Sequence, residues 1–198
     1  MMQPGFRLWL VRHAQPLVAP GLCYGASDVP ADAGATRQAA ERLAQQAPAH
    51  ALVWVSGLRR AQQLADALLQ LRPDLGSPQV DARLNEIDFG CWELQAWDRI
   101  ERASYDAWTA DFARHRFGGR ESVLELLTRV QQALADAHTQ RGAGRELIWV
   151  THAGVIRAVH YLASQPTGLP QASDWPQQAP AFGEWTTLDL KPLPSLQG

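Results

Sequence analysis

Leu8-Trp9-Leu10-Val11-Arg12-His13 is an apolar run that stops at an arginine and a histidine, and the expected fold can be built outward from it. A short run that is apolar at every position is typical of a parallel strand covered on both faces. The pattern returns at residues 51–55, which end at Ser56, and at 146–150, which are followed by Thr151 and His152. These three runs predict the centre of a parallel sheet.

Helix signals follow the first two predicted strands. Asp32 is a natural N-cap for a helix that runs to about residue 47. Ser56 occupies the corresponding place before the helix that carries Arg60, and we expect it to cap that helix. Apolar residues at helical spacing give this second helix one buried face: Leu64, Leu68 and Leu71.

The second half of the chain alternates in the same way. Ser122 and Glu125 have the spacing of a capping box, which predicts the start of another helix. A helix over 155–163 is expected after the third strand, and residues 185–190 are expected to form a last strand at the sheet edge. This order of elements predicts an α/β fold: a three-layer α/β/α sandwich with a mostly parallel sheet.

Length and composition narrow the class of protein. The chain has 198 residues, 46% hydrophobic and 19% charged, which suits one domain over 1–198 with a helical cover inserted at about 90–120. A formal net charge of −2 gives no reason to expect nucleic acid or a membrane surface as partner. Residues 1–11 read as a first strand rather than a signal peptide, and two cysteines suit a reducing compartment, so we expect a cytoplasmic protein.

Arginines and histidines lie at the ends of the predicted strands. Arg12 and His13 follow the first strand, Arg60 begins the helix after the second, and His152 follows the third. The carboxyl ends of parallel strands share one crevice, so these side chains should converge there. Guanidinium groups and helix N-termini both suit phosphate oxygens. The partner expected is therefore a small phosphorylated metabolite, and the arginines should disfavour the cationic form of His13.

Four segments resemble the motifs of the histidine phosphatase superfamily, which has the phosphoglycerate mutase-like fold. Leu10-Val11-Arg12-His13-Ala14-Gln15-Pro16 is similar to its signature, and Ser56-Gly57-Leu58-Arg59-Arg60-Ala61 to its second motif. Leu84-Asn85-Glu86-Ile87-Asp88-Phe89-Gly90 resembles the segment with the acid residue. Val150-Thr151-His152-Ala153-Gly154 resembles the segment with the second histidine. The motifs occur in family order.

The resemblance implies a metal-independent phosphatase that forms a phosphohistidine intermediate and needs no cofactor. His13 is then the nucleophile and Glu86 the general acid, while His152 joins Arg12 and Arg60 in binding the phosphate. Three further residues become candidates for the substrate pocket: Gln15, Tyr24 and Gly25. Ala14 and Gly57 depart from the usual family pattern of glycine and proline, respectively.

Two further segments indicate one branch of the superfamily: Cys23-Tyr24-Gly25-Ala26-Ser27-Asp28-Val29-Pro30 and Gly118-Gly119-Arg120-Glu121-Ser122. Both look like the α-ribazole phosphatase branch, which removes a phosphate during assembly of the cobalamin lower ligand. The alternatives are a phosphoglycerate mutase, a phosphate-binding module without activity, and a metallohydrolase built on His13, His152 and His160. The spacing of these histidines does not favour a metal site.

The cover segment is rich in tryptophan. Trp92, Trp97 and Trp108 could line a pocket for an aromatic substrate, although such residues more often pack a helix onto a sheet. The sequence alone leaves both interpretations open.

Overall fold

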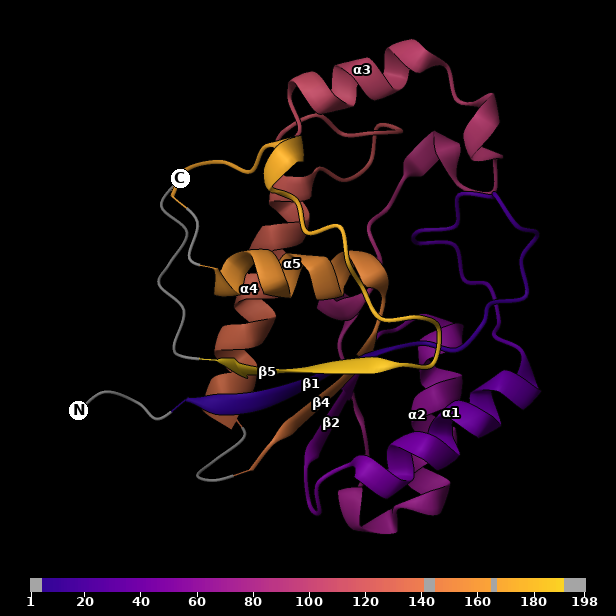
Figure 1. Cartoon of the computed structure of the whole chain (residues 1–198), viewed down its shortest axis with the longest axis vertical. Coiled ribbons are helices and arrows are strands. Elements are labelled where there is room, and N and C mark those ends of the chain that lie inside the picture. Colours follow the sequence, from indigo (N-terminus) through magenta and orange to yellow (C-terminus); the bar gives the residue numbers. More distant parts are fainter. Residues whose placement is uncertain (1–4, 141–144, 165–166, 191–198) are drawn as a thin grey trace.

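The core of the molecule is a five-stranded sheet. The computed structural model describes residues 5–140, 145–164 and 167–190. Its sheet has the strand order β3-β2-β4-β1-β5 (Figure 1), and every pairing is parallel except that of β5 with β1. The strands are β1 (Phe6–Arg12), β2 (Leu52–Val55), β3 (Gln79–Val80), β4 (Leu147–Thr151) and β5 (Trp185–Leu190). The predicted α/β fold with a mostly parallel sheet is thus confirmed.

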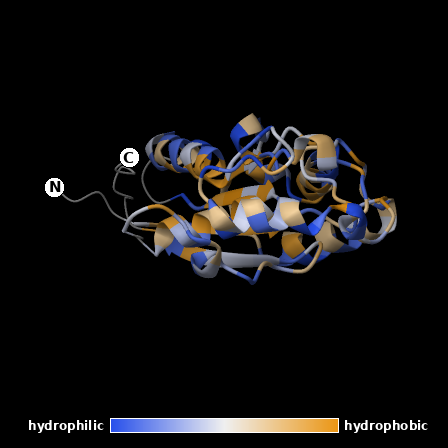
Figure 2. Cartoon of the chain, turned by 90° about the horizontal axis from the view of Figure 1, so that it is seen from above, coloured by the Kyte–Doolittle hydropathy of each residue, from blue (hydrophilic) through white to orange (hydrophobic). Residues whose placement is uncertain are grey.

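Helices cover both faces of this sheet. They are α1 (Ala33–Gln46), α2 (Arg59–Leu71), α4 (Val123–Gln140) and α5 (Ala153–Ala163), whereas α3 (Arg102–Ala110) lies away from the sheet, in the cover segment. The pair α1 and α2 lies on one face, and the pair α4 and α5 on the other (Figure 1). Figure 2 shows the hydrophobic residues concentrated in the layer between them. All five residues of β4 are buried, because this strand lies at the centre of the sheet with a helix pair on each side.

Two of the predicted helix caps are confirmed. Asp32 accepts a hydrogen bond from the backbone N–H of Ala35 at 2.7 Å, at the start of α1. Ser122 and Glu125 form a reciprocal capping box before α4: the Ser122 N–H donates to the Glu125 carboxylate, and the Glu125 N–H donates to Ser122 Oγ. These local signals predicted the helix starts correctly because a cap involves only neighbouring residues.

The expectation for Ser56 is wrong. Helix α2 begins at Arg59 with Leu58 as its N-cap residue, and no side chain caps it. Ser56 is completely buried, and its hydroxyl contacts His152 and Asn85 from other parts of the chain. The hydroxyl also accepts from the Leu58 N–H at 3.1 Å, but this bond lies before the helix and does not cap it.

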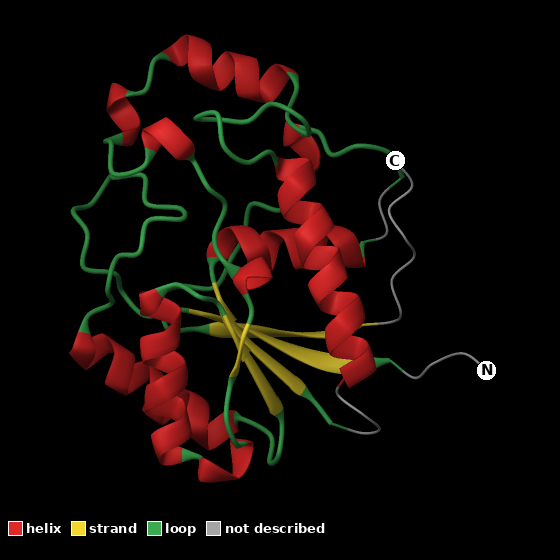
Figure 3. Ribbon diagram, turned by 180° about the vertical axis from the view of Figure 1, so that it is seen from behind, coloured by secondary structure: helices red, strands yellow, loops and turns green. Residues whose placement is uncertain are grey.

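The cover segment contains less regular helix than its pattern suggested. Only α3 is an α-helix; the short 3-10 helices Gly90–Trp92 and Trp97–Arg99 and several turns form the rest of residues 90–120 (Figure 3). Gly118 has φ of +82°, and a Cβ there would lie 1.7 Å from the carbonyl oxygen of Phe89. Glycine at this turn lets the cover chain pass directly against the segment that carries Glu86.

Part of the expected first strand lies outside the described residues. Strand β1 begins at Phe6, and residues 1–4 of the expected first strand lie outside the described part. None of the described helices combines the length and the apolar character needed to cross a membrane.

Candidate active site

His13 lines the cavity, and one of its two ring nitrogens is unprotonated. Its backbone N–H donates to the Thr151 carbonyl at 3.0 Å, which fastens the residue to the end of β4. Its ring Nδ1 lies 2.7 Å from the carbonyl oxygen of Ala14. A carbonyl oxygen only accepts, so Nδ1 carries the proton and Nε2 holds the lone pair. The Nε–H of Arg60 donates to this Nε2 at 3.3 Å.

His13 is strongly biased toward its neutral form. Burial, followed by the charges of Arg60 and Arg12, lowers its pKa to about 3, although the Ala14 carbonyl acts in the opposite direction. The expectation that its cationic form would be disfavoured is confirmed. At neutral pH the imidazole is a neutral base with an available lone pair.

Arg60 lies behind His13 and is completely buried. Its two terminal nitrogens donate to backbone carbonyl oxygens of the loop before α1, at 2.7 Å to Ser27 and 2.6 Å to Gly25. Burial lowers the pKa of Arg60, while the charges of nearby groups, Glu86 first among them, raise it. The guanidinium therefore joins α2, the loop and His13 in one hydrogen-bonded unit.

Arg12 stands on the other side of His13. Its guanidinium carbon lies 3.9 Å from the centre of the Phe182 ring, and one terminal nitrogen donates to the Pro180 carbonyl at 3.0 Å. Its Nε–H is buried and has no hydrogen-bond partner among the described residues. A buried donor without an acceptor is costly unless a ligand supplies one.

His152 is completely buried beneath His13, with 5.1 Å between the ring centroids. Its Nε2 lies 2.8 Å from Ser56 Oγ, and that hydroxyl lies 2.8 Å from Asn85 Oδ1. Asn85 Oδ1 also accepts from the Gly57 N–H at 2.7 Å, which identifies it as the amide oxygen. The single proton of Ser56 must go to this oxygen, so His152 Nε2 donates to Ser56.

This assignment leaves the other nitrogen of His152 unprotonated. Its Nδ1 is buried and has no partner among the described residues. Burial, with the charges of Arg60 and His13, lowers the pKa of His152 well below its ordinary value. Both histidines are thus neutral in this structure.

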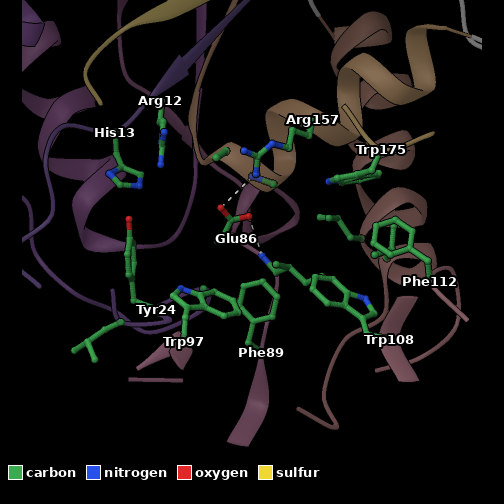
Figure 4. Close-up of a pocket in the computed structure, with 17 residues that line it drawn as sticks. Arg12, His13, Tyr24, Glu86, Phe89, Trp97, Trp108, Phe112, Arg157 and Trp175 are labelled. Carbon is green, nitrogen blue, oxygen red and sulfur yellow. Dashed lines mark hydrogen bonds between the residues drawn. The ribbon is translucent and has the colours of Figure 1, made fainter. Parts of the chain in front are cut away.

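Glu86 is held at the N-terminus of α5. Its Oε2 accepts from the Gly154 N–H at 3.0 Å, and its Oε1 accepts from the Ile87 N–H at 3.1 Å. Positive charge at a helix N-terminus stabilises a carboxylate there. The carboxyl group lies in the cavity between the two arginines Arg12 and Arg157 (Figure 4).

The site opens into a cavity of about 400 Å³. Arg12, His13 and Glu86 line one end, together with the pocket candidates Tyr24 and Gly25. Arg60 and His152 do not line it but lie behind, in contact with its wall. Gln15 does not line the cavity either, and its side chain is exposed.

The comparisons with known proteins agree with this geometry. A family model described as the histidine phosphatase superfamily (branch 1) matches residues 8–190. The chain belongs to this superfamily. Membership of this superfamily, together with the arrangement of the site, supports an activity of the phosphatase or mutase type.

Solved structures of similar fold match nearly the whole of this chain. A mycobacterial glucosyl-3-phosphoglycerate phosphatase with inorganic phosphate is 25% identical, with a TM-score of 0.77 over 93% of this chain and 89% of that chain. TTHB049 from Thermus thermophilus is 26% identical, with a TM-score of 0.67 over 93% of this chain and 94% of that chain.

A curated relative matches over a shorter part of the chain. The 6-phosphofructo-2-kinase/fructose-2,6-bisphosphatase of Arabidopsis thaliana is 26% identical over 121 residues, 59% of this chain. The match spans only 15% of that relative's length.

The metallohydrolase alternative finds no support in the side-chain arrangement. His160 is in the last turn of α5 and does not line the cavity that His13 lines. Within the described residues, no group of three or more histidine, cysteine, aspartate or glutamate side chains is placed to hold a metal ion.

Several residues at or beside this site were not found from the sequence. Glu93 accepts from the backbone N–H groups of Ala26, Ser27 and Phe89, and so ties the cover to the loop that Arg60 holds. Arg157 lines the cavity, and its position one turn after His152 on an expected helix was a usable signal. Trp175 and Phe182 come from the loop before β5, where no pattern marked them.

The buried neutral His13 should make the protein sensitive to acid. In the unfolded chain its pKa is about 6.5, whereas in the fold it is about 3. Between these values the unfolded state binds the extra proton, so the free energy of unfolding falls as the pH falls. Urea unfolding from pH 7 to pH 4 should show a weaker dependence for His13→Gln than for the wild type. His115→Gln, which changes a histidine outside the site, should keep the wild-type slope; equal slopes in all three proteins would contradict this account.

Proposed function

We propose that this chain is a metal-independent phosphomonoester hydrolase that works through a phosphohistidine on Nε2 of His13. The observation that carries the proposal is the state of that nitrogen. It is unprotonated, belongs to a histidine whose pKa is lowered to about 3, and lies between the guanidinium groups of Arg12 and Arg60 at the polar end of the cavity.

The first step transfers the phosphoryl group to the enzyme. A phosphomonoester dianion would repel an anionic nucleophile, whereas neutral imidazole attacks without that penalty. The bond from His13 Nε2 to phosphorus forms as the ester P–O bond breaks. As Nε2 bonds to phosphorus, the Arg60 Nε–H loses its acceptor there. It then joins the unpartnered Arg12 Nε–H in stabilising the charge on the oxygens that stay with phosphorus.

Protons move through two groups in this scheme. Glu86, in its protonated form, gives a proton to the departing alkoxide, and the resulting carboxylate later takes one from the water that attacks the phosphohistidine. Inorganic phosphate leaves and His13 becomes neutral again. The dianion also favours protonation of His152 at Nδ1, the atom that has no partner among the described residues.

Hydrolysis is favoured over the two alternatives by specific observations. The solved structures of similar fold include a phosphatase by name, with phosphate bound, which supports hydrolysis over mutase activity. A module that only binds phosphate would not need a carboxyl group fixed beside the nucleophile, as Glu86 is by Gly154.

For the substrate we propose α-ribazole 5′-phosphate, with the cytoplasm as location. Support comes from the likeness of residues 23–30 and 118–122 to that branch, and from Tyr24 and Gly25, which line the cavity. Cys23 and Cys91 are free thiols, as suits a reducing compartment.

The phosphohistidine can be trapped directly. Quenching turnover of a labelled phosphomonoester should leave acid-labile phosphate on His13, and His13→Ala should lose about 10³-fold or more in kcat. Activity should survive excess chelator, and vanadate should inhibit competitively. Label on another residue, or activity lost with chelator and restored by zinc or magnesium, would refute the proposal.

Glu86 should matter most for esters with poor leaving groups. An alkoxide needs a proton as it departs, whereas p-nitrophenolate needs little help. Glu86→Gln should therefore lower kcat/KM for alkyl phosphates by about 10²-fold or more, and far less for p-nitrophenyl phosphate. Measurement of both substrates with the same enzyme preparation removes any effect of misfolding. An equal loss on both would show that Glu86 does not act as the acid.

One set of assays distinguishes hydrolysis of α-ribazole 5′-phosphate from mutase activity. Phosphate release from α-ribazole 5′-phosphate should exceed that from 3-phosphoglycerate in kcat/KM, and 3-phosphoglycerate with a bisphosphate primer should yield little 2-phosphoglycerate. Efficient interconversion of the phosphoglycerates would instead identify a mutase.

A further inference from the structure

The cavity continues well beyond the phosphoryl end. Past Glu86 its walls are aromatic, and Figure 4 shows Phe89, Trp97, Trp108, Phe112 and Trp175 along this outer part. A cavity of about 400 Å³ has room for more than a phosphate group, and apolar walls with few polar groups are typical of sites for small organic molecules. The outer part is therefore where the leaving group of a substrate must lie.

The aromatic walls are held in place from behind. Phe117, which is buried and does not line the cavity, stacks with Trp108 at 4.6 Å between ring centroids and with Trp97 at 6.3 Å. The ring of Trp175 packs against Phe112 at 5.7 Å. These contacts set the ring orientations before any ligand binds, which reduces the entropy that binding would cost.

Arg157 is a charged side chain on the same side of the cavity as Trp175 (Figure 4). It lines the cavity from the second turn of α5, and its buried Nε–H has no partner among the described residues. It forms no ion pair within the described part of the chain, and its one hydrogen bond, to the Gln177 carbonyl, is long at 3.3 Å. The pKa of Arg12 is lowered by burial and also by the charge of Arg157, so both cations face the same space.

We propose that the outer cavity binds an aromatic leaving group that carries an anionic substituent, which pairs with Arg157. This inference rests on the proposed hydrolase function alone. α-Ribazole 5′-phosphate has an aromatic ring but carries ribose hydroxyls and no anion on its leaving group, so the anionic aromatic class is an alternative to that substrate. A polyhydroxylated leaving group would bury several hydroxyls against rings that offer few partners. A flat ring can stack on the tryptophans, and an anion supplies the acceptor that the Arg157 Nε–H lacks.

Primary alcohol phosphates of similar leaving-group basicity test the aromatic part. The set is 2-phenylethyl, 2-cyclohexylethyl and ethyl phosphate with glycerol 1-phosphate. The kcat/KM for the phenyl ester should exceed each of the others by about tenfold or more. Equal rates for the phenyl and cyclohexyl esters would overturn the proposal, and so would a preference for glycerol phosphate. Failure to hydrolyse any of the four would instead count against the hydrolase function itself.

Variants locate the preference within the cavity. Trp175→Ala and Trp175→Leu should both reduce the ratio of the phenyl to the ethyl ester to about threefold or less. Trp185→Ala, which removes a half-buried tryptophan that does not line the cavity, should keep the wild-type ratio. Because each result is a ratio within one preparation, partial misfolding cannot imitate it. An unchanged ratio in both Trp175 variants would contradict the assignment of this wall.

Carboxylated esters test the role of Arg157. At least one of 2-(3-carboxyphenyl)ethyl and 2-(4-carboxyphenyl)ethyl phosphate should have a KM about tenfold or more below that of the phenyl ester. Arg157→Gln should abolish this advantage, whereas Arg157→Lys should retain part of it and the exposed-site control Arg114→Gln all of it. No advantage for either ester, or an advantage that persists in Arg157→Gln, would overturn the pairing.

Discussion

The buried guanidinium of Arg60 is the group on which the other parts of the site rely. Its charge lies in the interior, yet it forms no salt bridge within the described residues; two loop carbonyls and the His13 imidazole accept its hydrogen bonds instead. Carbonyl oxygens stabilise the cation without neutralising it. Burial, and after it the charge of Arg60, lowers the pKa of His13, so one residue both organises the loop and helps to keep that imidazole neutral.

The loop that Arg60 holds is tied in turn to the aromatic cover. Glu93 accepts from three backbone N–H groups, two in the loop at Ala26 and Ser27 and one at Phe89 in the cover. Arg60, the loop and the aromatic cover are therefore connected by one continuous set of hydrogen bonds. The cover supplies Phe89, Trp97 and Trp108 to the cavity wall, while the arginines and histidines come from the strand ends, so the two parts of the wall can change independently in sequence.

The fold was largely predictable because its signals are local. The apolar runs that became β1, β2 and β4 are strands covered by helices on both faces, and such strands require apolar residues at nearly every position. The two-residue strand β3 was not predicted, since Gln79 and Val80 are too few to show a period. Ser56 was misjudged for a related reason: as a cap it had a local role, whereas the fold gives it a partner 96 positions away in His152.

Residue types and their order were enough to predict the nature of the chemistry. Arginine and histidine at the ends of predicted parallel strands have one meeting place, because such strands all end at the same edge of the sheet. The folded arrangement was needed to learn that the Arg60 Nε–H donates to His13 Nε2, that Arg60 and His152 lie behind the cavity rather than in it, and that Arg157 and Trp175 line it as well. Those features depend on hydrogen-bond partners and packing between segments far apart in the chain, and residue patterns carry no record of such distances.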